Sequence, residues 1–315
     1  MVKFNHDTTG IETVKHFKSE VDSKTIVVTG TSAGGLGAET AISLAHADPA
    51  QIVLLARSEK KVKPVRDEIS KLNSKIKVTI VPIELDNLES VGNAAKMIDG
   101  AVDKIDILIN NAGIMGVKEY TKNKHGIESQ FATNHLGHFV LTALVANKIR
   151  AAGTNARIIN LSSQGHLISA VRFDDYNFSD GSEYDPWSAY GQAKTANTLF
   201  SKGLAEKGIT SFSVHPGVIF DTSLGNHLEK DDFNAIAPIA MRNTGATFQL
   251  DPPKSTQQGV STTLRAALDP SLASQSGAYM EDANVKETFE YATSAENAQK
   301  LWILSEKLTG QKFDL

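Results

Sequence analysis

The chain has 315 residues, of which 41% are hydrophobic and 22% are charged, a composition typical of globular proteins that excludes disordered and fibrous classes. Its formal net charge of −4 provides no basic field for phosphate backbones, so nucleic acid is not an expected partner. The chain contains no cysteine, which excludes disulfides, thiolate catalysis and cysteine-ligated zinc. The lack of cysteine also suits a reducing compartment, and the cytoplasm is the expected one.

Residues 1–23 form a polar lead that lacks the apolar core of a secretory signal, and no later run approaches the ~18 apolar residues of a membrane span. From residue 24 onward, short β-branched runs alternate with longer amphipathic segments, as in βαβ units. Runs such as TIVVT and IDILI are apolar at nearly every position, which predicts strands buried on both faces of a parallel sheet. The expected strands are Thr25–Thr29, Gln51–Ala56, Lys77–Ile83, Ile105–Ile109, Arg157–Leu161 and Thr210–His215.

This rhythm predicts an α/β protein with a doubly wound parallel sheet, the Rossmann fold. Because the alternation continues past residue 200 without a Pro/Gly-rich linker or a repeat, residues 24–315 are interpreted as one domain. Few periodic signals occur in Leu224–Lys254, which follows the sixth expected strand and ends in a proline pair. We interpret this stretch, the lid segment, as a cover over the substrate.

A glycine-rich turn follows the first expected strand and opens a helix, in TGTSAGGLGAETAISLAH. Glycines permit close approach of the backbone to a pyrophosphate, and a helix N-terminus favours anions. The alternative is a tight turn that binds nothing. The dense clustering of Gly30, Gly34, Gly35 and Gly37 favours a dinucleotide site.

Further motifs follow in order: NNAG at 110–113, FATNHLGHF, RIINLSS, YGQAK, and HPG at 215–217. In this order and spacing, the set resembles the short-chain dehydrogenase/reductase family from about residue 24 to about residue 282. It is most similar to the branch of retinol dehydrogenases and fungal reductases, because of NHLGHF and the long insert before YGQAK. The resemblance implies an oxidoreductase that transfers a hydride between a nicotinamide cofactor and a carbonyl or alcohol substrate.

The chain departs from the family pattern at two points. The family's TGxxxGxG is one residue longer here, so Gly30, Gly35 and Gly37 are aligned with its three glycines, and Gly34 is either an insertion or a ligand. PGVIFDT is likewise one residue longer than PGxxxT, and Thr222 is aligned with the family's cofactor contact.

Hydride transfer to a carbonyl leaves an oxyanion, so the site needs an acid beside the carbonyl oxygen and a donor that polarises it. Tyr190 and Lys194 meet this need, because residues four apart in a helix project from one face. An unperturbed tyrosine, with a pKa of about 10, is protonated at neutral pH, and a neighbouring ammonium group can lower the pKa of Tyr190. The resemblance implies that Lys194 also holds the nicotinamide ribose.

The resemblance further implies that Ser163 hydrogen-bonds the substrate oxygen and that Asn134 supports a water that returns protons to the site. Ser162 is the alternative to its neighbour, and Asn134 could also satisfy a kink in its helix. No carboxylate pattern accompanies the histidines of this region. We therefore expect these histidines to have packing or surface roles and do not expect a metal site. These histidines are His135, His138 and His166.

A second YxxxK pair, Tyr120 with Lys124, shows that this spacing alone is weak evidence. It lies in a polar, loop-like stretch, EYTKNKHG, whereas Tyr190 stands in a helix with apolar periodicity and has Ser163 at the end of a strand upstream. We therefore expect Tyr190 to be the catalytic tyrosine.

Arg57 directly follows the second expected strand, about 20 positions after Gly37, where an acid would otherwise bind the ribose 2′-hydroxyl of NAD. Charge-assisted hydrogen bonds contribute about 1.5 to 3 kcal/mol, so Arg57 predicts a roughly ten- to hundredfold preference for NADP(H). Lys61 is either a second cation for the 2′-phosphate or a solvated lysine on a helix face.

Asp86 matches the family's acid on the adenine side, with turn capping as the alternative. The remaining cofactor contacts are implied by the resemblance alone, and Tyr190 and Lys194 belong to the cofactor set as well. They are Ser32, Leu36, Asn111, Ala112, Gly113, Pro216, Gly217 and Val218.

Two other functions stay open. A non-catalytic NADP(H)-binding sensor or interaction protein would keep this fold, but it would be free to lose the tetrad of Asn134, Ser163, Tyr190 and Lys194. An epimerase or dehydratase would use the same tyrosine and lysine, yet no signal of a sugar-nucleotide pocket is present. The expected partner is a small-molecule carbonyl or alcohol, and the family also implies a homo-oligomer as one possibility.

Overall fold

A computed structural model describes residues 3–313, which form one sheet flanked by helices. The strand order is β3-β2-β1-β4-β5-β6-β7-β8, parallel throughout except for β8 at the edge. The strands are β1 (Thr25–Thr29), β2 (Gln51–Ala56), β3 (Lys77–Pro82), β4 (Ile107–Asn110), β5 (Arg157–Leu161), β6 (Thr210–Val214), β7 (Tyr279–Glu281) and β8 (Asn284–Lys286). The single-domain Rossmann fold expected from the sequence is confirmed.

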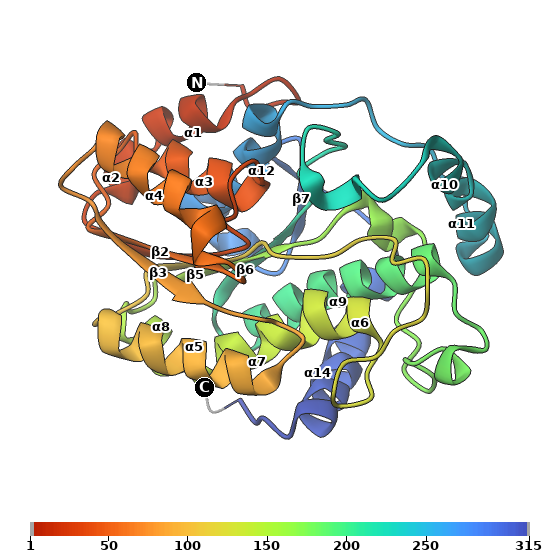
Figure 1. Ribbon diagram of the computed structural model, residues 1–315. Coiled ribbons are helices and arrows are strands. Elements are labelled where there is room, and N and C mark those ends of the chain that lie inside the picture. Colours follow the sequence, from red (N-terminus) through yellow and green to blue (C-terminus); the bar gives the residue numbers. More distant parts are fainter. Residues whose placement is uncertain (1–2, 314–315) are drawn as a thin grey trace.

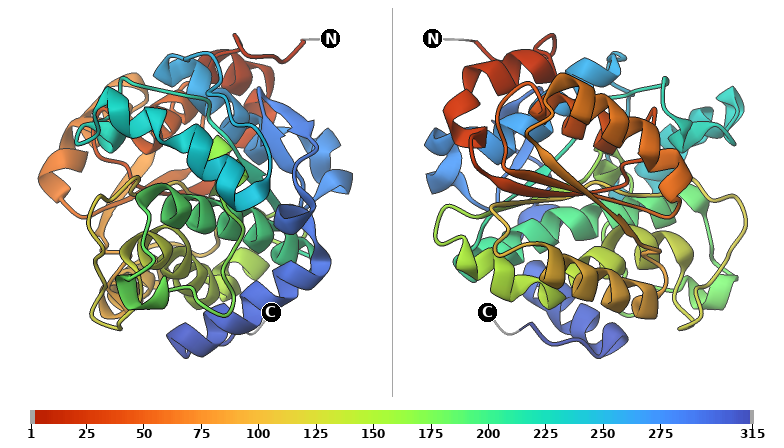
Figure 2. Two further views of the ribbon diagram at one scale, coloured as in Figure 1. Left: turned by 90° about the vertical axis from the view of Figure 1, so that its right-hand side faces the viewer. Right: turned by 60° about the vertical axis from the view of Figure 1, so that its left-hand side comes forward.

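Helices cover both faces of the sheet (Figure 1; Figure 2, right). One face carries α1 (Gly10–His16), α2 (Lys18–Val21), α3 (Leu36–Leu44), α4 (Glu59–Leu72) and α12 (Thr256–Leu268). The other carries α5 (Leu88–Ala101), α7 (Gly137–Leu144), α8 (Ala146–Ala151), α9 (Pro186–Glu206) and α14 (Ala295–Thr309). Each face has its own hydrophobic core, because every residue of β1, β2, β4 and β5 is buried and alternate side chains point to opposite faces.

The remaining helical segments are mostly short. They are α6 (Ser129–Phe131), the π-helical turn η1 (Ala132–Leu136), η2 (Gln164–Leu167), η3 (Ser179–Gly181), η4 (Ser223–Gly225), α10 (Lys230–Asn234), α11 (Ile236–Thr244), η5 (Pro270–Gln275) and α13 (Glu290–Thr293).

The polar lead is helical and packs on the domain. Val14 of α1 and Val21 of α2 are fully buried in the core that α1 shares with α12. A Cβ on Gly10 would lie only 2.5 Å from a methyl group of Val260, so α1 approaches α12 closely. The two ends of the described chain lie on opposite faces of the sheet (Figure 1).

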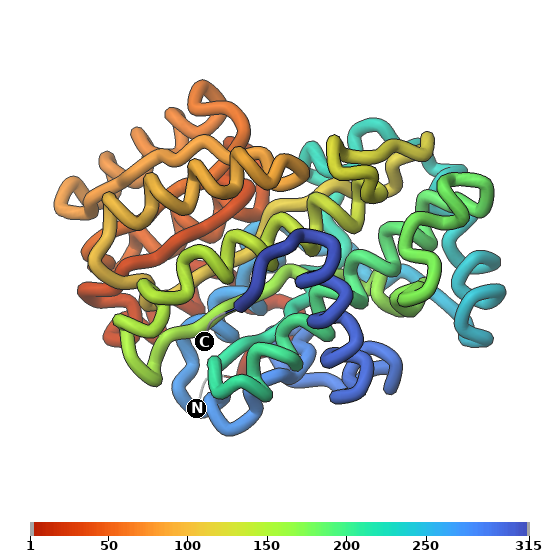
Figure 3. The backbone as a smooth tube through the Cα atoms, turned by 90° about the horizontal axis from the view of Figure 1, so that it is seen from below, coloured from red at the N-terminus to blue at the C-terminus, as the bar shows by residue number. Residues whose placement is uncertain are grey.

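The lid segment contains two short helices, α10 and α11, although its sequence has little periodicity. Only Ile236 and Ala240, one turn apart, are buried in α11, so a narrow apolar stripe suffices to hold it. The two helices project at one end of the molecule, beside the green segments that lead into α9 (Figure 2, left; Figure 3). No helix within residues 3–313 is both long and apolar enough to span a membrane.

Neighbouring strands of this sheet define where a ligand can bind. β1 lies between β2 and β4, so the chain leaves β1 toward one edge of the sheet and later returns to its other side. Such a switch point opens a crevice at the carboxyl ends of the strands. The glycine-rich turn after β1 and the NNAG motif after β4 both lie at this edge.

Candidate active site

The glycine-rich turn is packed against the NNAG motif. Gly30 has a φ of +74°, and a Cβ on it would lie 2.8 Å from the Cα of Ala112. A Cβ on Gly37 would lie 2.5 Å from both the carbonyl oxygen of Gly30 and the side-chain nitrogen of Asn111. Glycine is therefore required at both positions by close backbone packing at the switch point.

The two middle glycines differ from this pair. Gly34 has a φ of +79°, and a Cβ on it would meet nothing within 4 Å, so the loop bulges into open space there. Gly35 precedes α3 without providing a side-chain cap, which leaves the first amides of that helix for an anion. The longer loop thus absorbs its extra residue around Gly34 while Gly35 begins the helix.

Asn111 and Ala112 are held by the end of β1. The hydroxyl of Thr29 accepts hydrogen bonds from the amides of Asn111 (2.9 Å) and Ala112 (3.0 Å). The same hydroxyl lies 2.9 Å from Nε2 of the buried His138, whose Nδ1 lies 3.0 Å from the carbonyl oxygen of Asn134. Because Thr29 already accepts two hydrogen bonds, its proton points to His138, and the histidine donates from Nδ1 to Asn134.

Asn134 is fully buried in the π-helical turn η1. Its side chain bonds both main-chain groups of Ile114, accepting from the nitrogen (2.8 Å) and donating to the oxygen (2.9 Å). The side chain therefore braces the loop after β4 rather than the kink of its own helix. A Cβ on Gly113 would lie 3.0 Å from Oδ1 of Asn134 and 3.6 Å from Nζ of Lys194, so these three residues meet.

Tyr190 and Lys194 lie one turn apart on α9, which Asp185 caps by accepting a hydrogen bond from the amide of Ser188 (2.6 Å). Both side chains are buried. The ammonium group of Lys194 lies 5.6 Å from the centroid of the Tyr190 ring and donates a hydrogen bond to the carbonyl of Leu161 (3.0 Å), the last residue of β5.

Burial dominates the electrostatics of this pair. It raises the pKa of Tyr190 to about 12, which a hydrogen bond with Ser163 partly opposes, and it lowers the pKa of Lys194 to about 8. The sequence led us to expect that Lys194 lowers the pKa of the phenol. In the structure the pKa of Tyr190 is instead raised, and the largest cause is desolvation of the buried ring hydroxyl.

The two serines after β5 point in different directions. The hydroxyl of Ser162 donates to the carbonyl of Lys194 (2.9 Å) and lies 3.0 Å from the hydroxyl of Thr198, so it is engaged inside the fold. The hydroxyl of Ser163 accepts a hydrogen bond from the amide of Gly165 (3.0 Å) and bonds the Tyr190 phenol. Of the two serines, Ser163 is the one beside the tyrosine.

The second YxxxK pair is not assembled into a site. The hydroxyl of Tyr120 donates to Asp180 (3.3 Å), whereas Lys124 pairs with Glu89 (3.4 Å). The two side chains thus have separate acidic partners.

The expected cations follow β2, with Arg57 directly after the strand and Lys61 in the first turn of α4. Arg57 and Lys61 are exposed, and within the described residues neither forms an ion pair. The carbonyl of Lys61 accepts a hydrogen bond from the amide of Ala33 (2.9 Å), so this turn adjoins the glycine loop. Ser32, the neighbour of Ala33, is half-buried there.

The remaining expected contacts are spread along the same edge. Asp86 is exposed, and the cap of α5 is its neighbour Asn87, which accepts from the amides of Glu89 (3.2 Å) and Ser90 (3.4 Å). Leu36 contacts α12, since a Cβ on Gly259 would lie 3.3 Å from its methyl group. Four half-buried residues continue from β6 toward the lid segment: Pro216, Gly217, Val218 and Thr222.

The lid segment packs against the tyrosine. Ile236 and Ala240 form a small apolar cluster with Trp187 and Tyr190, whose rings lie 6.1 Å apart. The indole nitrogen of Trp187 donates to the carbonyl of Asp232 (2.8 Å), which ties α10 to α9. The lid segment thus places apolar side chains beside the ring of Tyr190.

Comparisons with known proteins agree with this geometry. The family model for short chain dehydrogenases matches residues 24–232. Mouse retinol dehydrogenase 12 is 32% identical over 299 residues, which cover 94% of this chain and 89% of that protein. A short-chain dehydrogenase/reductase of Penicillium roqueforti, prx1, is 34% identical over 304 residues, which cover 90% of this chain and 84% of that protein.

A solved structure is also similar. The carbonyl reductase from chicken fatty liver, determined with NADPH bound, superposes with a TM-score of 0.60 at 21% identity, covering 85% of this chain and 100% of that chain. This likeness shows the fold. The chain belongs to the short-chain dehydrogenase family of oxidoreductases. Within it, the chain belongs to the branch that resembles the retinol dehydrogenases.

Several residues at the site were not anticipated from the sequence. Thr29 and His138 connect the cofactor edge to Asn134, and Trp187 joins the phenol to the lid segment. Gly165 is needed because a Cβ there would lie 2.5 Å from Cε1 of Tyr190. Only the position of Trp187 one turn before Tyr190 was a usable signal. Within the described residues, no three or more His, Cys, Asp or Glu side chains gather so that they could hold a metal ion.

Proposed function

We propose that the protein is an NADP(H)-dependent reductase or dehydrogenase in which Tyr190 is the general acid and base. The observation that carries this is that the Tyr190 phenol has the Ser163 hydroxyl and the Lys194 ammonium group beside it, and that this ammonium group in turn lies next to Gly113 of the NNAG motif. This set can polarise a carbonyl oxygen and deliver a proton to it.

The residues along the switch point fit a dinucleotide. The uncapped N-terminus of α3 suits a pyrophosphate, and the strip Asn111–Gly113 lies against the turn at Gly30. The exposed Arg57, directly after β2, and Lys61, in the first turn of α4, support a 2′-phosphate and hence NADP(H) over NAD(H). Asp86, Pro216, Gly217, Val218 and Thr222 remain proposed contacts.

When bound, NADPH supplies the hydride. Ser163 and Tyr190 donate hydrogen bonds to the substrate oxygen, which polarise the carbonyl before transfer. As the oxygen gains negative charge, Tyr190 gives it the phenolic proton, and the ammonium group of Lys194 stabilises the phenolate that remains. Asn134 is proposed to support the water through which a proton returns, and for oxidation of an alcohol the same proton movements run in reverse.

The proposed substrate is apolar around its reacting carbon, because Trp187, Ile168 and Ile236 form an apolar cluster with Tyr190. Exposed apolar side chains continue this character, with Phe220 shortly before the lid segment and Leu224 and Leu250 within it. Closure of such a cover would exclude water from the developing oxyanion. We propose the cytoplasm as the compartment, and light scattering would decide between a monomer and a homo-oligomer.

The test is a screen of NADPH oxidation over aldehydes, ketones, quinones and retinoids, with Lys194→Ala as the blank. We expect turnover of at least one apolar carbonyl by the wild type and a near-complete loss in the variant. Activity that persists in Lys194→Ala would refute the proposed chemistry. NADPH binding without turnover of any compound, in either direction, would favour the non-catalytic binder.

A further inference from the structure

Gln164 directly follows Ser163 and begins the turn η2, with 8% of its surface exposed. Its side chain contacts the last part of the lid segment, after α11. The side-chain nitrogen donates to the carbonyl of Gln249 (2.8 Å), and the side-chain oxygen accepts from the amide of Asp251 (3.4 Å). One glutamine thus bonds the main chain at two positions of the lid segment.

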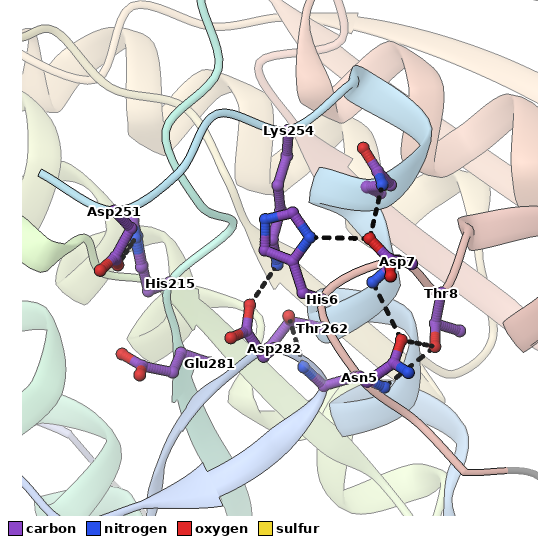
Figure 4. A network of polar contacts seen from close by, with 12 residues as sticks. Asn5, His6, Asp7, Thr8, His215, Asp251, Lys254, Thr262, Glu281 and Asp282 are labelled. Atoms are coloured by element: carbon purple, nitrogen blue, oxygen red, sulfur yellow. Dashed lines mark hydrogen bonds and ion pairs between the residues drawn. The ribbon is translucent and has the colours of Figure 1, made fainter.

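These two bonds attach the main chain of this stretch, while the side chain of Phe248 packs against the apolar cluster around Tyr190. Between residues 247 and 251, within the chain that the structure describes, the main chain hydrogen-bonds other elements only through the side chain of Gln164. Further along, Lys254 is fixed, because its amide donates to the carbonyl of Val218 (2.8 Å) and its buried ammonium group pairs with Asp282 (2.6 Å; Figure 4). Gln164 therefore holds the portion that lies between the fixed end and the helices α10 and α11.

His215 supports the same connection from β6. Its Nδ1 accepts a hydrogen bond from the amide of Gln164 (3.1 Å), so the ring proton is on Nε2. Nε2 lies 3.5 Å from a carboxylate oxygen of Asp251, too long for a strong hydrogen bond but close enough for electrostatic attraction (Figure 4). Contact with His215 is the first cause that lowers the pKa of Asp251.

We propose that Gln164 is a positioning residue that couples the placement of the lid segment to the orientation of Ser163. The backbone of Gln164 is continuous with Ser163, and its side chain is bonded to the lid segment. Displacement of residues 249 and 251 therefore pulls directly on the turn that aims the Ser163 hydroxyl at Tyr190. This inference rests on the proposed function for its catalytic consequence, but the coupling itself belongs to the protein without ligands.

Gln164→Leu removes both side-chain bonds at similar volume, and Gln164→Glu keeps an acceptor for the Asp251 amide while it loses the donor to Gln249. The matched control is Gln192→Leu. Gln192 of α9 is fully buried and has the same bonding pattern. Its side chain accepts from the amide of Arg172 (3.0 Å) and donates to the carbonyl of Tyr176 (3.0 Å), both in a loop outside the lid segment.

Hydrogen exchange of the ligand-free protein is measured across residues 245–252. We expect exchange there to be about tenfold faster in Gln164→Leu, faster by a smaller factor in Gln164→Glu, which keeps the acceptor for the Asp251 amide, and unchanged in Gln192→Leu. Unchanged exchange in the Gln164 variants, or equal acceleration by the control, overturns the proposal. If Gln164→Leu does not fold, Gln164→Glu provides the same readout.

Kinetics give the second readout. We expect kcat/KM for the carbonyl substrate to fall about tenfold in the Gln164 variants while the NADPH dissociation constant and the melting temperature stay near those of the wild type. A parallel loss of NADPH affinity would indicate a general structural role and overturn the proposal. The exchange experiment needs no ligand. An inactive wild type would therefore refute the proposed function but not the coupling between Gln164 and the lid segment.

Discussion

The contact between Gly165 and Tyr190 offers a substitution whose effect can be worked out from the structure. In Gly165→Ala the new Cβ would lie 2.5 Å from Cε1 and 2.8 Å from Cδ1 of Tyr190. An ordinary carbon contact needs about 3.5 to 4.0 Å, so the ring must move by ~1 Å. Gly165 has no positive φ, so the backbone itself accepts alanine and the whole effect acts through the ring.

A displacement of ~1 Å at a reacting group costs about 100-fold in rate. We therefore expect Gly165→Ala to lower kcat/KM about 100-fold in an NADPH-oxidation assay while NADPH affinity, measured by fluorescence titration, stays within a few-fold. The control is Gly92→Ala in α5, where a Cβ would meet nothing within 4 Å. It should retain full activity and gain up to about 1 kcal/mol in unfolding free energy, because alanine favours the helix. Activity of Gly165→Ala within threefold of the wild type would refute this placement of the phenol.

Three further predictions follow from the same geometry. Arg57→Ala should reduce the preference for NADPH over NADH roughly ten- to hundredfold, mainly by weakening the binding of NADPH. If titrations of both cofactors gave an unchanged ratio of dissociation constants, the selectivity would depend on Lys61 or the glycine loop instead. Burial lowers the pKa of Lys194 from its ordinary 10.5 to about 8, so between these pH values the unfolded chain binds more protons and stability rises with pH. Urea unfolding at pH 7 and pH 10 should show a rise of up to about 3 kcal/mol relative to Lys194→Met, and parallel profiles would contradict the burial. The lid segment should gain protection from hydrogen exchange when NADP(H) and a substrate-like ketone are both present, and equal exchange in the free and ternary states would leave it an ordinary surface excursion.

The sheet could be predicted where strands are continuous and apolar. β1, β2 and β5 begin and end at the predicted residues, and β3, β4 and β6 differ by one or two positions. β7 and β8 were not predicted, because each has only three residues and they are joined by a turn in which Asp282 and Ala283 adopt positive φ. Asp is favoured in such a turn but Ala is not, so the pair gives only a weak signal.

The sequence could predict that the motif residues lie close together, because parallel strands end at one edge of the sheet. The choice between Ser162 and Ser163 depended on the family register, and the structure supplies a physical reason, since Ser162 bonds α9 and Ser163 bonds Tyr190. Contacts between segments far apart in the sequence could not be predicted. The bond between Thr29 and His138 spans 109 positions, and those from Gln164 to the lid segment span 85 and 87.

The raised pKa of Tyr190 also lay outside what the sequence could indicate. The YxxxK spacing suggests a phenol made more acidic by a lysine, but burial raises the pKa of Tyr190 and lowers the pKa of Lys194. Spacing records which residues are neighbours, whereas desolvation depends on everything packed around them.

The central claim is that the reactive tyrosine is Tyr190 rather than Tyr120, and a paired substitution tests it most directly. The kcat/KM for NADPH-linked reduction is measured for Tyr190→Phe and for Tyr120→Phe in proteins with unchanged melting temperature. We predict a loss of at least about 100-fold in Tyr190→Phe, since the proton donor is removed, and a change below threefold in Tyr120→Phe. Full activity in Tyr190→Phe, or inactivation by Tyr120→Phe, would contradict the account.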